Sequence, residues 1–280
     1  MQLEILHMSA KGAQHRATDV LLVHGSFCGA WVWEPHIMPY LAEQGYNVHA
    51  LSLRGHGGSE VAAPLARTSL ADYAADVMSA VASIGRPLTA VGHSLGGAVV
   101  QSAIAAGVRF TGTALISSVP PSGMFLASQR MFWSHPRLWF ELSRMTYAGV
   151  GDADPEILRH GLFDNRISAA EFARLAPRFC DESSLAIFEL IGARCFGAPP
   201  SEAGPVLVMG GSRDWFISEA DNWQTAMWYG TKPVIVPGLS HAAMLDPDWM
   251  RAAAVLSGWL EGISETEATR DGAGAAEAAA

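Results

Sequence analysis

A serine stands between two glycines in Gly92-His93-Ser94-Leu95-Gly96. An apolar run precedes this motif and a helix-like run follows it, which predicts the strand–turn–helix in which G-x-S-x-G presents a nucleophile. The tight turn strains the backbone, and the glycines leave room for it. The hydroxyl then lies at the N-terminus of a helix, whose free N–H groups favour a developing anion. We therefore predict Ser94 as the nucleophile of an acyl-transfer reaction.

A serine hydroxyl needs a base to remove its proton. His241 follows the apolar run 234–236, and Asp214 follows the preceding run, 206–209. Both are therefore expected in loops at the carboxyl edge of a parallel sheet, where such sheets build their sites. The chain order Ser94, Asp214, His241 is the order that this motif uses. We predict His241 as the general base and Asp214 as the carboxylate that orients it.

Acyl transfer also needs N–H donors for the tetrahedral oxyanion, and losing one typically costs ~10²–10³ in rate. The amide of Leu95, directly after the nucleophile, is the first predicted donor. The second is expected in the loop after the first long apolar run, which reads His24-Gly25-Ser26-Phe27. Gly25 suits the bend, and we select the Ser26 amide, with the Phe27 amide as the alternative.

The elements that must position these residues alternate between short apolar runs and helix-like stretches, a pattern typical of parallel strands joined by crossover helices. Apolar strands of this kind are buried on both faces of a sheet. The predicted strands are 20–23, 48–53, 88–91, 113–119, 205–209 and 233–236, with 3–8 as an antiparallel edge. The predicted helices are 35–44, 69–84, 95–106 and 246–261. The fold class is therefore α/β, with helices on both faces of a mostly parallel sheet.

Residues 121–204 break this alternation, because they contain no clear apolar strand. A connection of that length is too long for a loop, so it predicts a helical cap, or lid, inserted between two strands. Residues 1–120 and 205–264 are expected to form the α/β core. The tail 265–280 is small and polar and is predicted to be disordered.

The composition excludes several classes of protein. Half of the 280 residues are apolar and 16% are charged, which is too apolar for a disordered chain. The net charge, 18 − 27 = −9, argues against a nucleic-acid partner, because no basic stripe is available for phosphates. The N-terminus has no signal-peptide pattern, and no apolar run approaches the ~20 residues that cross a bilayer. We expect a cytoplasmic protein without stable membrane insertion.

The cysteines are Cys28, Cys180 and Cys195. Three cysteines do not make a disulfide framework, and these are not spaced as a zinc site. No metal site is predicted. Two alternatives remain for Cys180 and Cys195: they form a disulfide, or they are buried free thiols.

The motifs together resemble the serine-dependent α/β-hydrolase superfamily from about Val20 to Leu260. The turn at residues 53–59, LRGHGGS, is similar to that of bacterial esterases and lipases. The stretch HGSFCGAWVW is similar to the plant hydroxynitrile lyase and methylesterase branch. The resemblance implies the α/β-hydrolase fold with an eight-strand sheet, a helical cap and no cofactor. Serine at position 94 weighs against haloalkane dehalogenases and epoxide hydrolases, which use a carboxylate there.

The function predicted from these residues is a serine hydrolase of the carboxylesterase type, which cleaves a small, largely apolar carboxylic ester through an acyl-enzyme. A lyase, a C–C-bond hydrolase or a perhydrolase would use the same triad. From a different class, a small-molecule receptor could use the same fold without turnover. The methionines and aromatics of 121–204 predict an apolar roof over the site. The predicted pocket residues are Phe27, His93, Phe125, Trp133 and Trp215.

Overall fold

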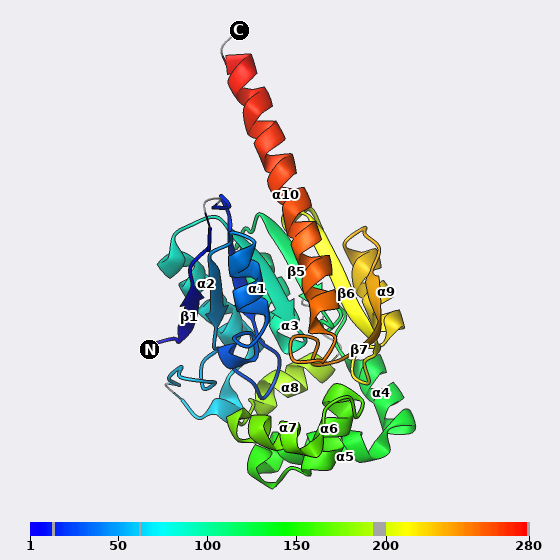
Figure 1. Ribbon diagram of the computed structural model, residues 1–280. Helices are drawn as coiled ribbons and strands as arrows, with labels where there is room; N and C mark the ends of the chain where they lie inside the picture. The colour runs from blue at the N-terminus through cyan, green and yellow to red at the C-terminus, as the bar shows by residue number, and fades with distance from the viewer. Residues whose placement is uncertain (13–14, 62, 193–199, 279–280) are drawn as a thin grey trace.

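A computed structural model describes residues 1–12, 15–61, 63–192 and 200–278 of the chain (Figure 1). Its sheet has the strand order β1-β3-β2-β4-β5-β6-β7. The strands are β1 (Ile5–Met8), β2 (Asp19–Val23), β3 (Val48–Leu51), β4 (Leu88–His93), β5 (Gly112–Ile116), β6 (Val206–Arg213) and β7 (Val234–Ser240). β1 pairs antiparallel with β3, and every other pairing is parallel. The α/β fold class and the antiparallel edge strand are therefore confirmed.

The sheet has seven strands in the described part of the chain, whereas the family resemblance implied eight. The predicted apolar run 3–8 contains β1, Ile5–Met8, which is the edge strand that pairs with β3.

The sheet is buried because helices cover both of its faces. Along β2 the side chains alternate: Val20 and Leu22 belong to one apolar cluster, and Leu21 and Val23 to the other. All four are fully buried. Helices α1 (Ile37–Glu43) and α10 (Trp249–Ala278) contribute to the first cluster. Helices α2 (Leu70–Ile84) and α3 (Leu95–Ala105) contribute to the second, and α9 (Glu219–Trp228) contacts β6.

Helix α2 shows how local sequence sets these boundaries. Ser69 caps its N-terminus by accepting a hydrogen bond from the Asp72 amide, and the Asp72 carboxylate accepts one from the Ser69 amide. This reciprocal pair satisfies two backbone donors that the helix leaves free. Gly85 ends the helix at φ +63°, a left-handed conformation that glycine adopts readily.

Helix α10 corrects the predicted disordered tail. It begins at Trp249 and continues to Ala278, so residues 265–278 are helical rather than disordered (Figure 1). The chain after Asp246 contains proline only at position 247, and alanine and glutamate recur through the tail. Both are strong helix formers, which favours propagation of the helix beyond the body of the protein. Residues 279–280 lie outside the described residues.

Residues between β5 and β6 form a group of helices, here called the helical insertion. It comprises α4 (Phe125–Ser134), α5 (Pro136–Ala148), α6 (Pro155–Phe163), α7 (Ala169–Leu175) and α8 (Ser184–Ile191). Figure 1 shows these helices gathered at one end of the sheet, where β6 ends. Short 3₁₀ helices lie at Ala30–Val32, Leu65–Arg67, Val150–Asp152, Ala176–Arg178 and Pro200–Glu202.

Candidate active site

Ser94 occupies the sharp turn between β4 and α3. Its backbone has φ +52° and ψ −119°, a positive-φ conformation that residues other than glycine rarely adopt. The Ser94 amide donates to the carbonyl of Ile116 at 3.1 Å, and its carbonyl accepts from the Gly97 amide at 3.1 Å. Hydrogen bonds on both sides therefore hold the turn, and the side chain is presented at the end of β4.

The glycines of the motif are required by close backbone packing. A Cβ on Gly92 would lie 2.6 Å from the Cα of Gly97, and a Cβ on Gly96 would collide with the carbonyls of Val23 and His24. Real Cβ atoms do not approach backbone atoms so closely. The sequence G-x-S-x-G is thus what allows α3 to begin directly against β2.

The structure brings the three predicted triad residues together. The Nε2 atom of His241 lies 3.2 Å from the Ser94 Oγ, and its Nδ1 atom lies 2.9 Å from both carboxylate oxygens of Asp214. Asp214 follows β6 and His241 follows β7, so the shared carboxyl edge of the sheet positions both. A carboxylate only accepts hydrogen bonds, so the Nδ1 of His241 carries the proton and Nε2 accepts from the hydroxyl.

Asp214 stays ionised although it is buried. Burial alone would raise its pKa, but the electrostatic attraction to the His241 imidazole and the hydrogen bonds from His241 and the Ile217 amide hold that pKa below its usual value. Oδ1 accepts from the amides of Phe216 and Ile217 at 2.8 and 2.9 Å. The first turn after β6 therefore fixes the carboxylate and keeps it charged.

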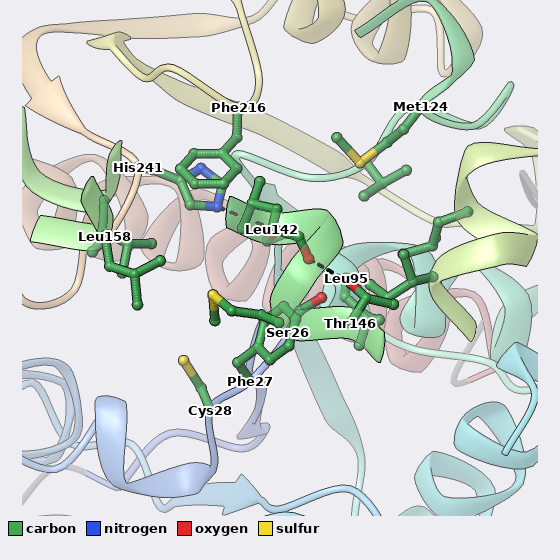
Figure 2. A pocket seen from close by; sticks show the side chains of 18 of the residues that line it. Ser26, Phe27, Cys28, Leu95, Met124, Leu142, Thr146, Leu158, Phe216 and His241 are labelled. Atoms are coloured by element: carbon green, nitrogen blue, oxygen red, sulfur yellow. Dashed lines mark hydrogen bonds between the residues drawn. The ribbon is translucent and has the colours of Figure 1, made fainter. Parts of the chain in front are cut away.

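Phe216 and His93 also hold the His241 imidazole in place. The Phe216 ring stacks on it at 4.4 Å between centroids, and Figure 2 shows the two side by side at the pocket. His93 lies 3.0 Å, through Nε2, from the carbonyl of His241. Sequence reasoning missed Phe216, because an aromatic residue two positions after Asp214 has no distinguishing pattern.

The loop that carries Ser26 is oriented by His24. The Nδ1 atom of His24 lies 2.8 Å from the Gly25 carbonyl, and its Nε2 accepts from the Leu53 amide at 3.0 Å. Burial lowers the pKa of His24 to about 3, so the ring is neutral and Nδ1 donates. The Gly25 carbonyl and the Ser26 N–H belong to one trans peptide, whose two groups point in opposite directions. The Ser26 N–H therefore points away from His24.

The Ser26 and Leu95 amides are the available donors beside Ser94. Within the described residues neither makes a hydrogen bond to another protein group. The alternative donor, the Phe27 amide, instead donates to Glu182 at 3.3 Å. A Cβ on Gly25 would lie 3.1 Å from the Ser94 Cβ, so this loop packs against the serine. The geometry favours Ser26 over Phe27.

A cavity of about 440 Å³ opens beside Ser94 and His241, between the sheet edge and the helical insertion. Most of its lining is aliphatic or aromatic, and Figure 2 shows Met124, Leu142, Leu158 and Phe216 around it. Within the described residues no Asp, Glu, Lys or Arg lines it. The polar side chains beyond Ser26, Ser94 and the histidines are hydroxyls.

Three cavity-lining hydroxyls are already satisfied by the protein. The hydroxyl of Ser143 donates to the carbonyl of Trp139, and that of Thr146 donates to the carbonyl of Leu142. The Ser128 hydroxyl accepts from the Trp139 indole N–H at 3.0 Å. Tyr147, which is 80% exposed, adds a further hydroxyl to the lining, so a ligand in this cavity meets a largely apolar, uncharged surface away from Ser94.

The structure places two of the five predicted pocket residues, Phe27 and His93, in the cavity lining, and corrects the other three. Phe125 is 49% exposed and Trp133 is 81% exposed, both on the outer side of α4. The Trp215 ring stacks on His135 at 3.9 Å, outside the cavity.

The reason for this error is helical periodicity. Met124, Ser128 and Met131 line the cavity, and their spacings of four and three residues place them on one face of the helix. Phe125 and Trp133 follow the inward residues by one and two positions and so point elsewhere. Aromatic composition alone does not say which face of α4 is inward.

Two cysteines lie close together at the cavity, and one of them, Cys28, belongs to its lining. Cys28 and Cys180 are free thiols, and the Cys180 Sγ donates to the Cys28 carbonyl at 3.3 Å. Cys195 lies outside the described residues, and so does the suggested pairing of Cys180 with it. In the described ranges no cluster of His, Cys, Asp and Glu could hold a metal ion. No described helix is both long and apolar enough to cross a membrane.

Comparison with known proteins agrees with this architecture. Residues 20–253 match the alpha/beta hydrolase family, and the chain belongs to that family. No curated protein sequence matches the chain. Among solved structures it is similar to a thermophilic esterase from Thermogutta terrifontis, with 19% identity, a TM-score of 0.70 and 94% of each chain covered.

Two further solved structures have the same fold. A monoacylglycerol lipase from Paleococcus ferrophilus is 18% identical, with a TM-score of 0.67, 94% of this chain covered and 100% of the other. A bromoperoxidase from Bacillus anthracis is 18% identical, with a TM-score of 0.68 and coverages of 92% and 96%. At these identities the likeness shows the fold.

Proposed function

We propose that this protein is a serine hydrolase that cleaves a small, uncharged, largely apolar carboxylic ester through an acyl-enzyme. One observation carries the proposal: a continuous hydrogen-bond chain, Asp214–His241–Ser94, ends at a cavity whose described lining contains no Asp, Glu, Lys or Arg. The chain supplies an activated nucleophile, and the cavity supplies a site for an apolar acyl or alcohol group.

In the acylation step, the Ser94 Oγ attacks the ester carbonyl while its proton passes to the Nε2 of His241. The imidazolium that forms is stabilised by the ionised Asp214 across the 2.9 Å contact at Nδ1. The carbonyl oxygen becomes an oxyanion, which the Ser26 and Leu95 amides bind. The oxyanion then reforms the carbonyl, the bond between the acyl carbon and the alcohol oxygen breaks, and the alcohol leaves with the proton from Nε2.

In the deacylation step, water takes the place of the alcohol. Nε2 of His241 removes a proton from the water as the water oxygen attacks the acyl carbonyl. The same two amides bind the second oxyanion. Collapse of this intermediate breaks the bond to the Ser94 Oγ, returns the proton to the serine, and releases the carboxylic acid.

The helical insertion would serve as the cap of this site. It contributes Met124, Leu142 and Leu158 to the wall of the cavity that Ser94 also lines, so apolar side chains surround the space beside the nucleophile. A carboxylate or ammonium on the substrate would lose its hydration in this cavity without a countercharge, at a cost of several kcal/mol. Neutral esters are therefore the expected substrates, and the names of the esterase and the lipase of the same fold support this class.

Covalent labelling followed by an ester panel tests the proposal. A fluorophosphonate is expected to add one phosphonyl group to the protein at Ser94, located by peptide mass spectrometry, and the same protein should hydrolyse p-nitrophenyl esters. Ser94→Ala should lose both properties, whereas Ser134→Ala, a change at an exposed serine of α4, should keep them. Labelling at Ser94 without ester turnover would reject ester hydrolysis. A lyase, a perhydrolase or a small-molecule receptor would then be the remaining candidates.

A further inference from the structure

Glu182 lies in the helical insertion, just before α8, and its carboxylate is fully buried. Oε1 accepts from the Tyr73 hydroxyl at 2.5 Å and from the Ser183 amide at 2.7 Å. Oε2 lies 3.2 Å from the Nε2 of His56 and accepts from the Phe27 amide at 3.3 Å. One carboxylate thus joins the insertion to α2, to the loop after β3, and to the loop that carries Ser26.

The Glu182 carboxylate is ionised and paired with a protonated His56. The Nδ1 of His56 lies 3.0 Å from the Arg54 carbonyl, and its Nε2 faces the carboxylate, so both ring nitrogens meet acceptors and both must donate. Burial disfavours both charges, but their mutual attraction raises the pKa of His56 and lowers that of Glu182. A buried charge persists only when it is paired in this way.

The residue that Glu182 contacts has a strained backbone. Phe27 has φ +61°, although it is not glycine, and such a conformation persists only where the surroundings hold it. Its amide donates to Glu182, and its carbonyl accepts from the Cys180 amide at 3.0 Å. Residues 180–182 therefore bind both main-chain polar groups of Phe27.

We propose that Glu182 is a positioning residue for the oxyanion site, an inference that rests on the proposed ester hydrolysis. It fixes the peptide between Ser26 and Phe27 by holding the Phe27 N–H away from the cavity. His24 fixes the preceding peptide through the Gly25 carbonyl. The Ser26 amide lies between these two anchors, so its direction is set before the oxyanion forms. Donors that need no reorganisation during the reaction stabilise the transition state most.

Glu182→Gln tests this role with a side chain of the same shape. In either orientation of the amide, its NH₂ end faces a main-chain N–H, that of Phe27 or that of Ser183, so one hydrogen bond is lost. The charge that holds His56 is also lost. We expect kcat for a p-nitrophenyl ester to fall roughly 10- to 100-fold with KM within about 3-fold, because a misaligned donor weakens transition-state binding more than substrate binding.

Asp19→Asn is the matched control. Asp19 is also a buried carboxylate, paired with Arg86, but it lies at the opposite end of β2 from the Ser26 loop. The control should lower Tm by an amount similar to that of Glu182→Gln while leaving kcat unchanged. Equal kcat values in wild type, Glu182→Gln and Asp19→Asn would overturn the inference. Glu182 would then only stabilise the contact between the helical insertion and the rest of the protein.

Two further measurements keep the result decisive. Tyr73→Phe removes one hydrogen bond from the Glu182 carboxylate without leaving a cavity, and we expect a kcat loss of roughly 3- to 10-fold at unchanged KM, since hydrogen bonds to charged groups are the stronger ones. If Glu182→Gln does not fold, an unchanged kcat in Tyr73→Phe overturns the inference. Fluorophosphonate labelling of wild-type Ser94 separates the two claims: absence of labelling and turnover rejects the proposed function, whereas normal labelling rates in a folded Glu182→Gln reject only the positioning role.

Discussion

The His93 imidazole donates from Nε2 to the main-chain carbonyl of His241, 3.0 Å away. The two rings lie 4.8 Å apart. Burial and the nearby His241 lower the pKa of His93 to about 3, so the ring is neutral at every pH at which the fold is expected to be stable. The residue directly before the proposed nucleophile thus holds the proposed base in place without adding a charge to the site.

The neutral buried histidines predict acid sensitivity of the fold. In the unfolded chain, imidazoles gain protons below their usual pKa of 6.5, whereas His24 and His93 stay neutral in the folded protein down to about pH 3. The unfolded state therefore binds more protons, and stability is full above pH 6.5 and falls toward pH 3. Each histidine contributes a slope of about 1.4 kcal/mol per pH unit in the middle of this window.

Urea unfolding measured between about pH 6 and pH 4 checks this slope, with His93→Asn as the informative variant. The variant should be less stable at neutral pH, and its stability should fall less steeply with acid, by about 1.4 kcal/mol per pH unit. His15→Asn, which removes an exposed imidazole, serves as the control. Parallel slopes in wild type and His93→Asn would show that His93 becomes protonated in the folded state.

The triad residues predict graded losses of activity. Ser94→Ala should reduce ester turnover on the order of 10⁶-fold, because no nucleophile remains. Asp214→Asn should reduce it about 10⁴-fold, because an amide no longer fixes the proton on the Nδ1 of His241. Steady-state kinetics on one p-nitrophenyl ester, with circular dichroism to verify folding, measures both. Turnover in Ser94→Ala within tenfold of wild type would mean that another group is the nucleophile.

The fold class and the edge where the site lies could be predicted because both follow from local rules. Apolar runs of strand length, separated by helix-like stretches, require a parallel sheet, and the carboxyl ends of parallel strands meet at one edge. Ser94, Asp214 and His241 each follow such a run, so the sequence alone places them at that edge. The fold class is confirmed, and the structure brings the three side chains within hydrogen-bond distance.

The pocket residues and the role of Glu182 could not be predicted from the sequence, because they depend on contacts between segments that lie far apart in the chain. Which face of α4 turns inward is decided by its packing on α5 and α8, so Phe125 and Trp133 could not be assigned correctly from composition. Glu182 lies 126 residues from His56, and a lone glutamate before a helix predicts only a solvated residue. The full length of α10 does not follow from the sequence pattern, because the small residues of the tail are typical of disorder, whereas alanine also favours helix.

Gly92→Ala should destabilise the fold strongly. Its Cβ would lie 2.6 Å from the Cα of Gly97 and from the carbonyl oxygen of Gly96, and backbone atoms at the start of α3 cannot yield as a side-chain tip can. Overpacking of this kind typically costs about 1–3 kcal/mol. Gly258→Ala is the control: a Cβ there meets nothing within 4 Å, and alanine in the α10 helix should stabilise it by roughly 0.5–1 kcal/mol. Chemical denaturation of both variants measures the difference, and a Gly92→Ala protein as stable as wild type would contradict the packing of β4 against α3.

The apolar cavity predicts a dependence of rate on acyl-chain length. Each methylene buried in it should contribute up to about 0.8 kcal/mol, so the three methylenes that separate acetate from pentanoate esters give roughly 60-fold in kcat/KM. Leu142→Ala removes apolar contact from the cavity wall and should reduce kcat/KM for the pentanoate ester roughly tenfold, with little change for acetate. Leu126→Ala, the same substitution at a side chain that is 67% exposed, should leave the whole series unchanged. A flat series from acetate to pentanoate in wild type would mean that the acyl chain lies outside this cavity.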